Sequence, residues 1–245
     1  MTKERIALVT GAAKGIGKAI VDRFISENYF VIAVDIDELS GKSLIDEYGS
    51  SKVLFQKVDI CNEQEIHHLF VKIKNDYKHL NVLINNAGII RDNMIWNMPV
   101  EDFDLVINVN LKGTWLLCKE AAKLMKQQNS GRIVNIASRA WLGNRGQTNY
   151  AASKAGVVSM TRVLALELGK YNVYVNAIAP GFFPSEMTQA FEKDPTMLKY
   201  VESRTSINRW GKDGELNGAL LYFASDASSY TTGQILAVDG GWLAE

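Results

Sequence analysis

Cysteine and net charge are both scarce in this chain of 245 residues. The two cysteines, Cys61 and Cys118, are too few for a disulfide framework and too far apart for a zinc site or a Cys-x-x-Cys motif. The 27 basic and 27 acidic residues balance, so no overall field attracts nucleic acid or an anionic membrane surface. We therefore expect a protein of a reducing cytoplasm that acts on small molecules, with no nucleic-acid or membrane partner.

Long apolar runs and clustered metal ligands are also missing. No stretch approaches the ~18 apolar residues that a membrane span requires. The apolar run after the first five residues is too short for a signal peptide and lacks a small-residue cleavage pattern. The histidines, His67, His68 and His79, have no further ligand at metal-binding spacing. We expect neither a targeting segment nor a metal site.

Short apolar runs rich in β-branched residues alternate with amphipathic helical stretches. Runs such as Ile-Ala-Leu-Val at 6–9 are apolar throughout, as is typical of parallel strands buried on both faces. With no internal repeat and no linker, the pattern predicts one α/β domain over residues 1–245, with a Rossmann-type doubly wound parallel sheet of seven strands flanked by helices. The predicted strands are residues 6–10, 30–35, 53–58, 82–85, 133–137, 173–178 and 235–238.

Proline is rare, and three of the four prolines fall between residues 180 and 209. Pro180, Pro184 and Pro195 cannot occupy a central strand or a helix interior. We expect this segment to form a loop with short helices over the edge of the sheet. A long excursion that directly follows a strand is a candidate substrate loop.

The first predicted strand leads into a glycine-rich turn, Thr10-Gly-Ala-Ala-Lys-Gly-Ile-Gly17, and then into a helical stretch. Glycines let the backbone approach a pyrophosphate closely, and the unpaired N–H groups of a helix N-terminus attract its charge. On their own the glycines fit a purely structural turn equally well. Their position after the first strand, together with an acidic residue that ends the second, favours a dinucleotide site.

That acidic residue is Asp35. A carboxylate there can accept hydrogen bonds from the adenosine-ribose hydroxyls and repels a 2′-phosphate, which favours NAD(H) over NADP(H). Lys14 favours NADP(H) instead, because a cation in the glycine turn can pair with a 2′-phosphate. NADP(H) therefore stays possible. We interpret the neighbouring Asp37 and Glu38 as a helix N-cap or solvated acids.

Tyr150 and Lys154 lie four residues apart in a helical stretch, which places the phenol and the ammonium on one helix face. An adjacent cation favours the phenolate and so lowers the tyrosine pKa toward the range of an acid–base catalyst. Ser138 ends the fifth predicted strand, where ligands of open α/β sheets bind, and can donate a hydrogen bond to a developing alkoxide. Asn110 is polar in an apolar helical stretch and would by itself indicate a bend or a core amide.

Taken in order, these motifs resemble the short-chain dehydrogenase/reductase family over essentially the whole chain. The resemblance implies an enzyme that transfers a hydride between nicotinamide and a carbonyl or alcohol carbon. It implies that Tyr150 exchanges the proton and that Lys154 lowers the Tyr150 pKa and holds the nicotinamide ribose. Ser138 would orient the carbonyl. The motifs are the glycine turn, Asn85-Asn-Ala-Gly88, Asn110, Ser138, Tyr150-x-x-x-Lys154 and Pro180-Gly181.

The resemblance also assigns Asn110 and the walls of the cofactor site. Asn110 would position a water that relays protons from Lys154. The segment 85–88 would stabilise the sheet and line the adenine-ribose side, Asp59 would meet the adenine, and Phe183 would border the nicotinamide. The expected substrate contacts are Ser138 and Tyr150, and the expected cofactor-binding residues are Gly11, Lys14, Gly15, Ile16, Gly17, Asp35, Ile36, Asp59, Ile60, Asn86, Ala87, Gly88, Tyr150, Lys154, Pro180, Gly181, Phe183 and Ser185.

Within the family, the chain most resembles 3-oxoacyl-(acyl-carrier-protein) and acetoacetyl-CoA reductases. This branch implies a cytoplasmic homotetramer of fatty acid metabolism, assembled through the helical stretches 110–125 and 150–169. Its substrate would be a ketone or secondary alcohol, carried by CoA or by an acyl carrier protein. The matching stretches are residues 86–94, 143–156, 223–228 and 232–241.

Three features depart from this branch. Asp35 suits NAD(H), whereas such reductases mostly use NADPH. The stretches 127–130 and 170–172 carry little positive charge for an acidic carrier, and the stretch Arg139-Ala-Trp-Leu142 is one residue shorter than usual. Two alternatives therefore stay open: a polyol, sugar-acid or hydroxysteroid dehydrogenase with Phe182 and Phe183 as pocket walls, and a non-catalytic dinucleotide-binding regulator.

Overall fold

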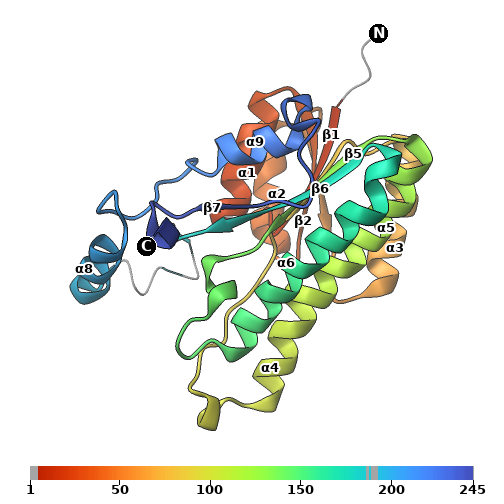
Figure 1. The fold of residues 1–245 in the computed structure, drawn as a ribbon. Coiled ribbons are helices and arrows are strands. Elements are labelled where there is room, and N and C mark those ends of the chain that lie inside the picture. The colour runs from red at the N-terminus through yellow and green to blue at the C-terminus, as the bar shows by residue number, and fades with distance from the viewer. Residues whose placement is uncertain (1–4, 186–187, 189–192, 245) are drawn as a thin grey trace.

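A parallel sheet of seven strands forms the centre of the molecule in a computed structural model, which describes residues 5–185, 188 and 193–244 (Figure 1). The strand order is β3-β2-β1-β4-β5-β6-β7, so the order reverses between β1 and β4. This confirms the predicted doubly wound α/β fold, and every predicted strand is present. The strands are β1 Arg5–Thr10, β2 Tyr29–Asp35, β3 Val53–Lys57, β4 Val82–Asn85, β5 Gly131–Ile136, β6 Val173–Pro180 and β7 Ile235–Val238.

The strands are apolar throughout because helices cover both faces of the sheet. Along β1, Ala7 and Val9 join one buried cluster, whereas Ile6 and Leu8 join the other. The first cluster packs under α1 (Gly15–Ser26), α2 (Glu38–Tyr48) and α9 (Asn217–Ala224), and the second under α3 (Glu63–Asp76), α5 (Thr114–Gln128) and α6 (Thr148–Leu168). Alternate side chains of one strand thus fill two separate cores.

The remaining helices are short. α4 (Val100–Ile107) packs against α6 and runs into a π-helix, Asn108–Gly113, which continues directly into α5. Each backbone hydrogen bond of a π-helix spans one residue more than in an α-helix, and such turns are frequent at functional sites. α8 (Pro195–Arg204) lies beside the C-terminal end of the chain (Figure 1). The single-turn 3₁₀ helices are Ile95–Asn97, Arg139–Leu142, Gly169–Tyr171, Asp226–Ser228 and Trp242–Ala244.

The proline-rich segment differs from its prediction at one end. The sequence predicts Pro180 in a loop, but it is the last residue of β6, where it pairs with Val238. The ladder tolerates it because the next residue, Gly181, donates its N–H to the carbonyl oxygen of Val238. Pro195 begins α8 behind the N-cap Asp194, the position where a proline is best tolerated. Residues 186–187 and 189–192 of the expected substrate loop lie outside the described residues.

Within the described ranges, no helix is long and apolar enough to cross a membrane. The same residues contain no group of three His, Cys, Asp or Glu side chains that could hold a metal ion.

Candidate active site

A cleft of about 960 Å³ lies along the carboxyl ends of the strands. Gly11 follows β1, Asp35 ends β2, Gly88 follows β4, Ser138 follows β5 and Gly181 follows β6, and all five line this cleft. Crevices outside the carboxyl ends of strands, next to a reversal of strand order, are where open α/β sheets bind ligands. Every cofactor-binding residue expected from the sequence also lines the cleft.

The glycine turn leaves an open approach to the start of α1. Gly11 and Gly15 have positive φ angles of 62° and 52°, which other residues rarely adopt. A Cβ on Gly17 would lie 1.8 Å from the carbonyl oxygen of Gly11, so only glycine fits where the helix crosses the turn. The N-cap Lys14 makes no capping hydrogen bond with its side chain, and the first N–H groups of α1 have no side-chain cap. This cradle fits the pyrophosphate of a dinucleotide.

Asp35 is fixed at the end of β2 by two backbone hydrogen bonds. Its carboxylate accepts from the N–H of Ala13 and from the N–H of Asp37, each at 3.0 Å. Lys14 lies 2.8 Å from the carboxylate of Asp37, and this hydrogen bond holds the pKa of Asp37 well below its ordinary value. Asp37 also caps α2 by accepting from the N–H of Ser40, which confirms its interpretation as an N-cap. Lys14, the cation of the glycine turn, is thus paired with Asp37 and not with Asp35.

The loop after β4 is tied to the glycine turn. Asn86 donates from Nδ2 to the carbonyl oxygens of Thr10 and Gly11, at 3.0 and 3.1 Å. The Thr10 hydroxyl accepts from the N–H groups of Asn86 and Ala87. Across the cleft, Asp59 and Ile60 follow β3. These contacts give the segment 85–88 a direct part in shaping the cleft wall.

Below this loop, a buried polar network joins β4, β5 and α6. Asn85 and Asn135 are register partners in neighbouring strands, and Asn85 Nδ2 donates to Asn135 Oδ1 at 2.8 Å. Asn135 in turn donates to the hydroxyl of Thr161, and Asn85 also donates to the sulfur of Cys118. Burial raises the pKa of the Cys118 thiol to about 12, so the thiol stays protonated. The network supports the sheet beneath the site.

Asn110 lies in the π-helix and is fully buried. Its side chain clamps the backbone of Ile89, accepting from the N–H at 2.8 Å and donating to the carbonyl oxygen at 2.9 Å. It also donates to the hydroxyl of Ser153 on α6. The side-chain amide therefore holds the wall of the cleft in place, and a Cβ on Gly88 would lie 3.1 Å from its oxygen.

Tyr150 and Lys154 both come from the first turns of α6, and Ser138 faces them from the end of β5. The Lys154 ammonium is buried, donates to the carbonyl oxygen of Ile136 at 2.8 Å and lies 5.6 Å from the centre of the Tyr150 ring. A hydrogen bond joins the Ser138 hydroxyl and the Tyr150 phenol and lowers the Tyr150 pKa. The structure thus brings the three side chains together in one cleft.

The pKa of Tyr150 differs from its prediction. The sequence predicts that Lys154 lowers it, but burial of the phenol raises the Tyr150 pKa to about 12, outweighing the Ser138 hydrogen bond. Burial also lowers the pKa of Lys154 to about 8. The phenol is therefore protonated at neutral pH, as a proton donor must be.

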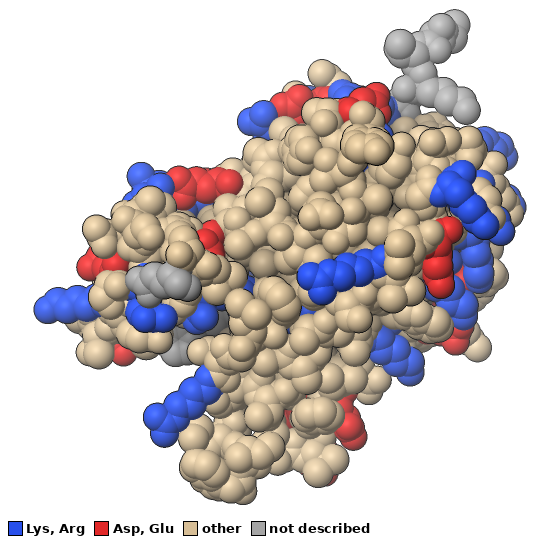
Figure 2. Space-filling model, viewed as in Figure 1, with Lys and Arg blue, Asp and Glu red and all other residues tan. Residues whose placement is uncertain are grey.

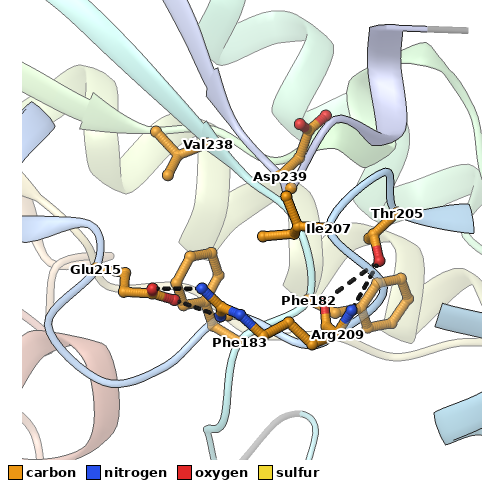
Figure 3. A pocket seen from close by; sticks show the side chains of 10 residues that line it. Phe182, Phe183, Thr205, Ile207, Arg209, Glu215, Val238 and Asp239 are labelled. Carbon is orange, nitrogen blue, oxygen red and sulfur yellow. Dashed lines mark hydrogen bonds and ion pairs between the residues drawn. The ribbon is translucent and has the colours of Figure 1, made fainter. Parts of the chain in front are cut away.

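Pro180, Gly181, Phe183 and Ser185 form the far wall of the cleft. A Cβ on Gly181 would lie 2.8 Å from the Cα of Asp239, so the backbone passes close to the turn after β7. Phe183 also lines a smaller neighbouring cavity of about 220 Å³ (Figure 3). Beside it, Arg209 and Glu215 form a two-point ion pair with N–O distances of 2.7 and 2.9 Å.

Several lining residues were missed by the sequence interpretation. Asp92 accepts from the Gln147 amide at 2.7 Å, and burial raises the Asp92 pKa. Arg139, which also lines the cleft, follows Ser138 directly. Adjacency to recognised motifs was the available signal for all of them, since Asp92 lies in the stretch 86–94 and Gln147 in the stretch 143–156.

Comparison with known proteins gives matches over nearly the whole chain. The family model described as Enoyl-(Acyl carrier protein) reductase matches residues 11–243. The 3-oxoacyl-[acyl-carrier-protein] reductase of Thermotoga maritima is 43% identical over 241 residues, 97% of each chain. The (2S)-[(R)-hydroxy(phenyl)methyl]succinyl-CoA dehydrogenase subunit BbsD of Thauera aromatica is 39% identical and covers 98% of this chain and 96% of its own.

Solved structures show the same architecture. The crystal structure of a gluconate 5-dehydrogenase from Burkholderia cenocepacia, in complex with NADP and tartrate, matches with a TM-score of 0.94 at 27% identity. The match covers 98% of this chain and 96% of that one.

Proposed function

This chain belongs to the short-chain dehydrogenase/reductase family and is an NAD(P)-dependent oxidoreductase, and from that premise we propose that it reduces 3-oxoacyl thioesters. The observation that carries the proposal is the group of Ser138, Tyr150 and Lys154 at the carboxyl edge of β5 and the start of α6, in which Lys154 is buried and the other two are half-buried. A relative at 43% identity has 3-oxoacyl-[acyl-carrier-protein] reductase as its name. A second, at 39%, is named for an acyl-CoA substrate.

The chemistry assigned to the chain's own residues is proton transfer and orientation. The bound dinucleotide supplies the hydride. As negative charge develops on the carbonyl oxygen, the Ser138 hydroxyl donates a hydrogen bond to it and the Tyr150 phenol gives it a proton. The raised Tyr150 pKa keeps the phenol protonated at neutral pH, as the acid of the reductive step must be. Lys154, held by Ile136, adds a positive charge beside the phenol.

We propose NAD(H) as the preferred cofactor. Asp35 lines the cleft with a carboxylate fixed by two backbone N–H groups, where it would accept from ribose hydroxyls and repel a 2′-phosphate. Lys14, the cation that could favour NADP(H), is paired with Asp37. The gluconate 5-dehydrogenase was crystallised with NADP, so NADP(H) stays the alternative.

A spectrophotometric screen tests the substrate. We expect NADH oxidation with acetoacetyl-CoA, and little or no activity with gluconate or a hydroxysteroid in the presence of NAD. Gluconate is the second candidate because of the named gluconate 5-dehydrogenase. Activity confined to sugar acids or steroids would overturn the acyl assignment.

A non-catalytic regulator is the alternative of another class, and catalysis with any of these substrates would exclude it. We further propose a homotetramer that forms through α5 and α6, because α6 exposes Leu166 and Val163 and α5 exposes Trp115. Large apolar side chains gathered on one exposed surface are typical of subunit interfaces. The cytoplasmic location expected from the sequence stays a prediction.

A further inference from the structure

Arg139 is a buried arginine beside the site whose charge the proposed chemistry does not use. It begins the short helix Arg139–Leu142, directly after Ser138, lines the cleft and is 9% exposed. Its guanidinium carbon lies 3.9 Å from the centre of the Trp242 ring and 5.2 Å from the centre of the Phe182 ring. Two aromatic rings from distant parts of the chain therefore hold this cation at the cleft wall.

Within residues 5–185, 188 and 193–244, the Arg139 guanidinium makes no hydrogen bond or ion pair. Tyr200 and Asp239 act on its charge only through space, and the two carboxylate oxygens of Asp239 accept from the N–H groups of Gly241 and Leu243, each at 3.0 Å. Arg204 also lies against the Trp242 ring, at 5.5 Å, and adds positive charge. A buried guanidinium without an anion is costly, since its charge is desolvated and not compensated.

Stacking constrains what this cation can bind. A guanidinium held against aromatic faces keeps its N–H groups in its own plane, where they match the two oxygens of a carboxylate. Ser138, the preceding residue, accepts from the N–H of Ala140 and bonds the Tyr150 phenol, which fixes the start of the same short helix. An anion on Arg139 therefore lies close to the carbonyl that Ser138 orients.

We propose that Arg139 binds a carboxylate on the substrate, and that the preferred substrates are 3-oxoacyl thioesters whose acyl chain ends in a carboxylate. This inference rests on the proposed function. The pyrophosphate of the dinucleotide is an unsuitable partner, because its cradle lies at Gly11–Gly17, across β4 from β5. The phosphates of CoA lie at the far end of a long flexible arm from the thioester, whereas Arg139 adjoins the residue that holds the reacting carbonyl.

A matched pair of thioesters tests the inference. 3-Oxoadipyl-CoA ends in a carboxylate, and 3-oxohexanoyl-CoA has the same chain length but ends in a methyl group. We expect kcat/KM to favour 3-oxoadipyl-CoA by about 100-fold, the effect of a charge-assisted two-point hydrogen bond. Arg139→Met should lose that preference by slowing the first substrate alone, because methionine still packs against Trp242 and Phe182. NADH affinity, measured by fluorescence, should not change.

Arg145→Met is the matched control, since Arg145 is an exposed cation at the same cleft and should leave the preference intact. Equal kcat/KM for both thioesters in the parent enzyme would overturn the inference and leave the proposed function standing. Equal losses with both substrates in Arg139→Met would do the same, by making Arg139 structural. Relief of inhibition by free CoA in that variant would assign the cation to a CoA phosphate instead. Failure of the parent to reduce either thioester would overturn the proposed function itself.

Discussion

Tyr150 is half-buried and its phenol has one hydroxyl partner, Ser138; desolvation raises the Tyr150 pKa to about 12. Tyr150→Phe keeps the ring and removes the proton, so we expect turnover to fall about 10³-fold, the usual contribution of general acid catalysis. Steady-state kinetics with an accepted ketone measure the loss, and fluorescence titration should show unchanged NADH affinity. Turnover equal to that of the parent would contradict the assigned role.

Asp35 offers a test of cofactor preference. Asp35→Asn removes the charge but keeps the shape of a side chain that anchors Ala13 and Asp37. We expect NADH affinity to fall about 10-fold, because hydrogen bonds to a charged group are the strong ones, and the preference over NADPH to shrink. Paired kcat/KM values for the two cofactors measure both effects.

Asp37→Asn is its control, because asparagine caps a helix as well as aspartate does. This variant also loses one negative charge and the pairing with Lys14, so it is compared for NADH affinity alone, which should stay close to that of the parent. Equal losses of NADH affinity in the two variants would mean that local charge alone, and not the Asp35 carboxylate, holds this cofactor.

The lowered pKa of Lys154 makes the free energy of unfolding depend on pH. Burial lowers its pKa from 10.5 to about 8, so between these values the unfolded chain binds more protons than the folded one. Stability contributed at this position therefore rises with pH across the window, by about 3 kcal/mol. In Lys154→Met that rise should vanish. Urea unfolding of both proteins from pH 8 to 10.5 measures it, and parallel curves would contradict the folded-state pKa.

The β1–α1 turn depends on a close approach that only glycine allows. In Gly17→Ala the new Cβ would meet the carbonyl oxygen of Gly11, which is backbone and cannot move aside easily. We expect a loss of about 1–3 kcal/mol in the free energy of unfolding and at least a 10-fold weaker binding of NADH. Calorimetry and fluorescence titration measure the two effects.

Gly218→Ala is the matched control, because Gly218 lies in α9 with nothing within 4 Å of the added Cβ. Alanine is the better helix former, so this variant should gain about 0.5–1 kcal/mol and bind NADH normally. If Gly17→Ala were as stable as Gly218→Ala and bound NADH as well, the β1–α1 turn would be able to shift to accommodate a Cβ.

The elements that the sequence predicts well are those whose pattern is local. Continuous apolar runs predicted the seven strands, and Asp37 could be predicted as a cap because its partner, Ser40, is three residues away. The π-helix at Asn108–Gly113 could not be predicted, because its apolar spacing is that of an ordinary helix. Pro180 extends β6 because its neighbour, Gly181, supplies the ladder hydrogen bond.

Properties of the site that depend on segments far apart in the chain could not be predicted from the sequence. The pKa of Tyr150 follows from burial, which no spacing of residues specifies. Arg139 gains its surroundings from Phe182 and Trp242, which lie far along the chain. Sequence motifs could therefore identify the reacting groups, but they could not predict how far these groups are buried or which distant residues surround them.

Across the whole molecule, the surface over α6 and α4 is mostly uncharged (Figure 2). Leu166 is 85% exposed there, and Leu166→Glu places a charge on the proposed interface. We expect the variant to sediment as a smaller species than the parent, for which we propose a tetramer. Leu39→Glu, at an 83% exposed position on α2, is the control and should keep the parent's assembly. Identical sedimentation of all three proteins would contradict an interface at α6.

The pair of Asn85 and Asn135 has a consequence for how the chain avoids misfolding. Apart from Gly131 and the buried Arg132, the other residues of β4 and β5 are aliphatic, so many alignments of the two strands would bury similar apolar area. A slip by one residue would separate the two amides and set each against hydrocarbon, leaving buried donors and acceptors unsatisfied. The free-energy cost of a register slip therefore arises at the strand ends that carry the site. A misaligned sheet, in which the cleft would be distorted, is disfavoured by this cost.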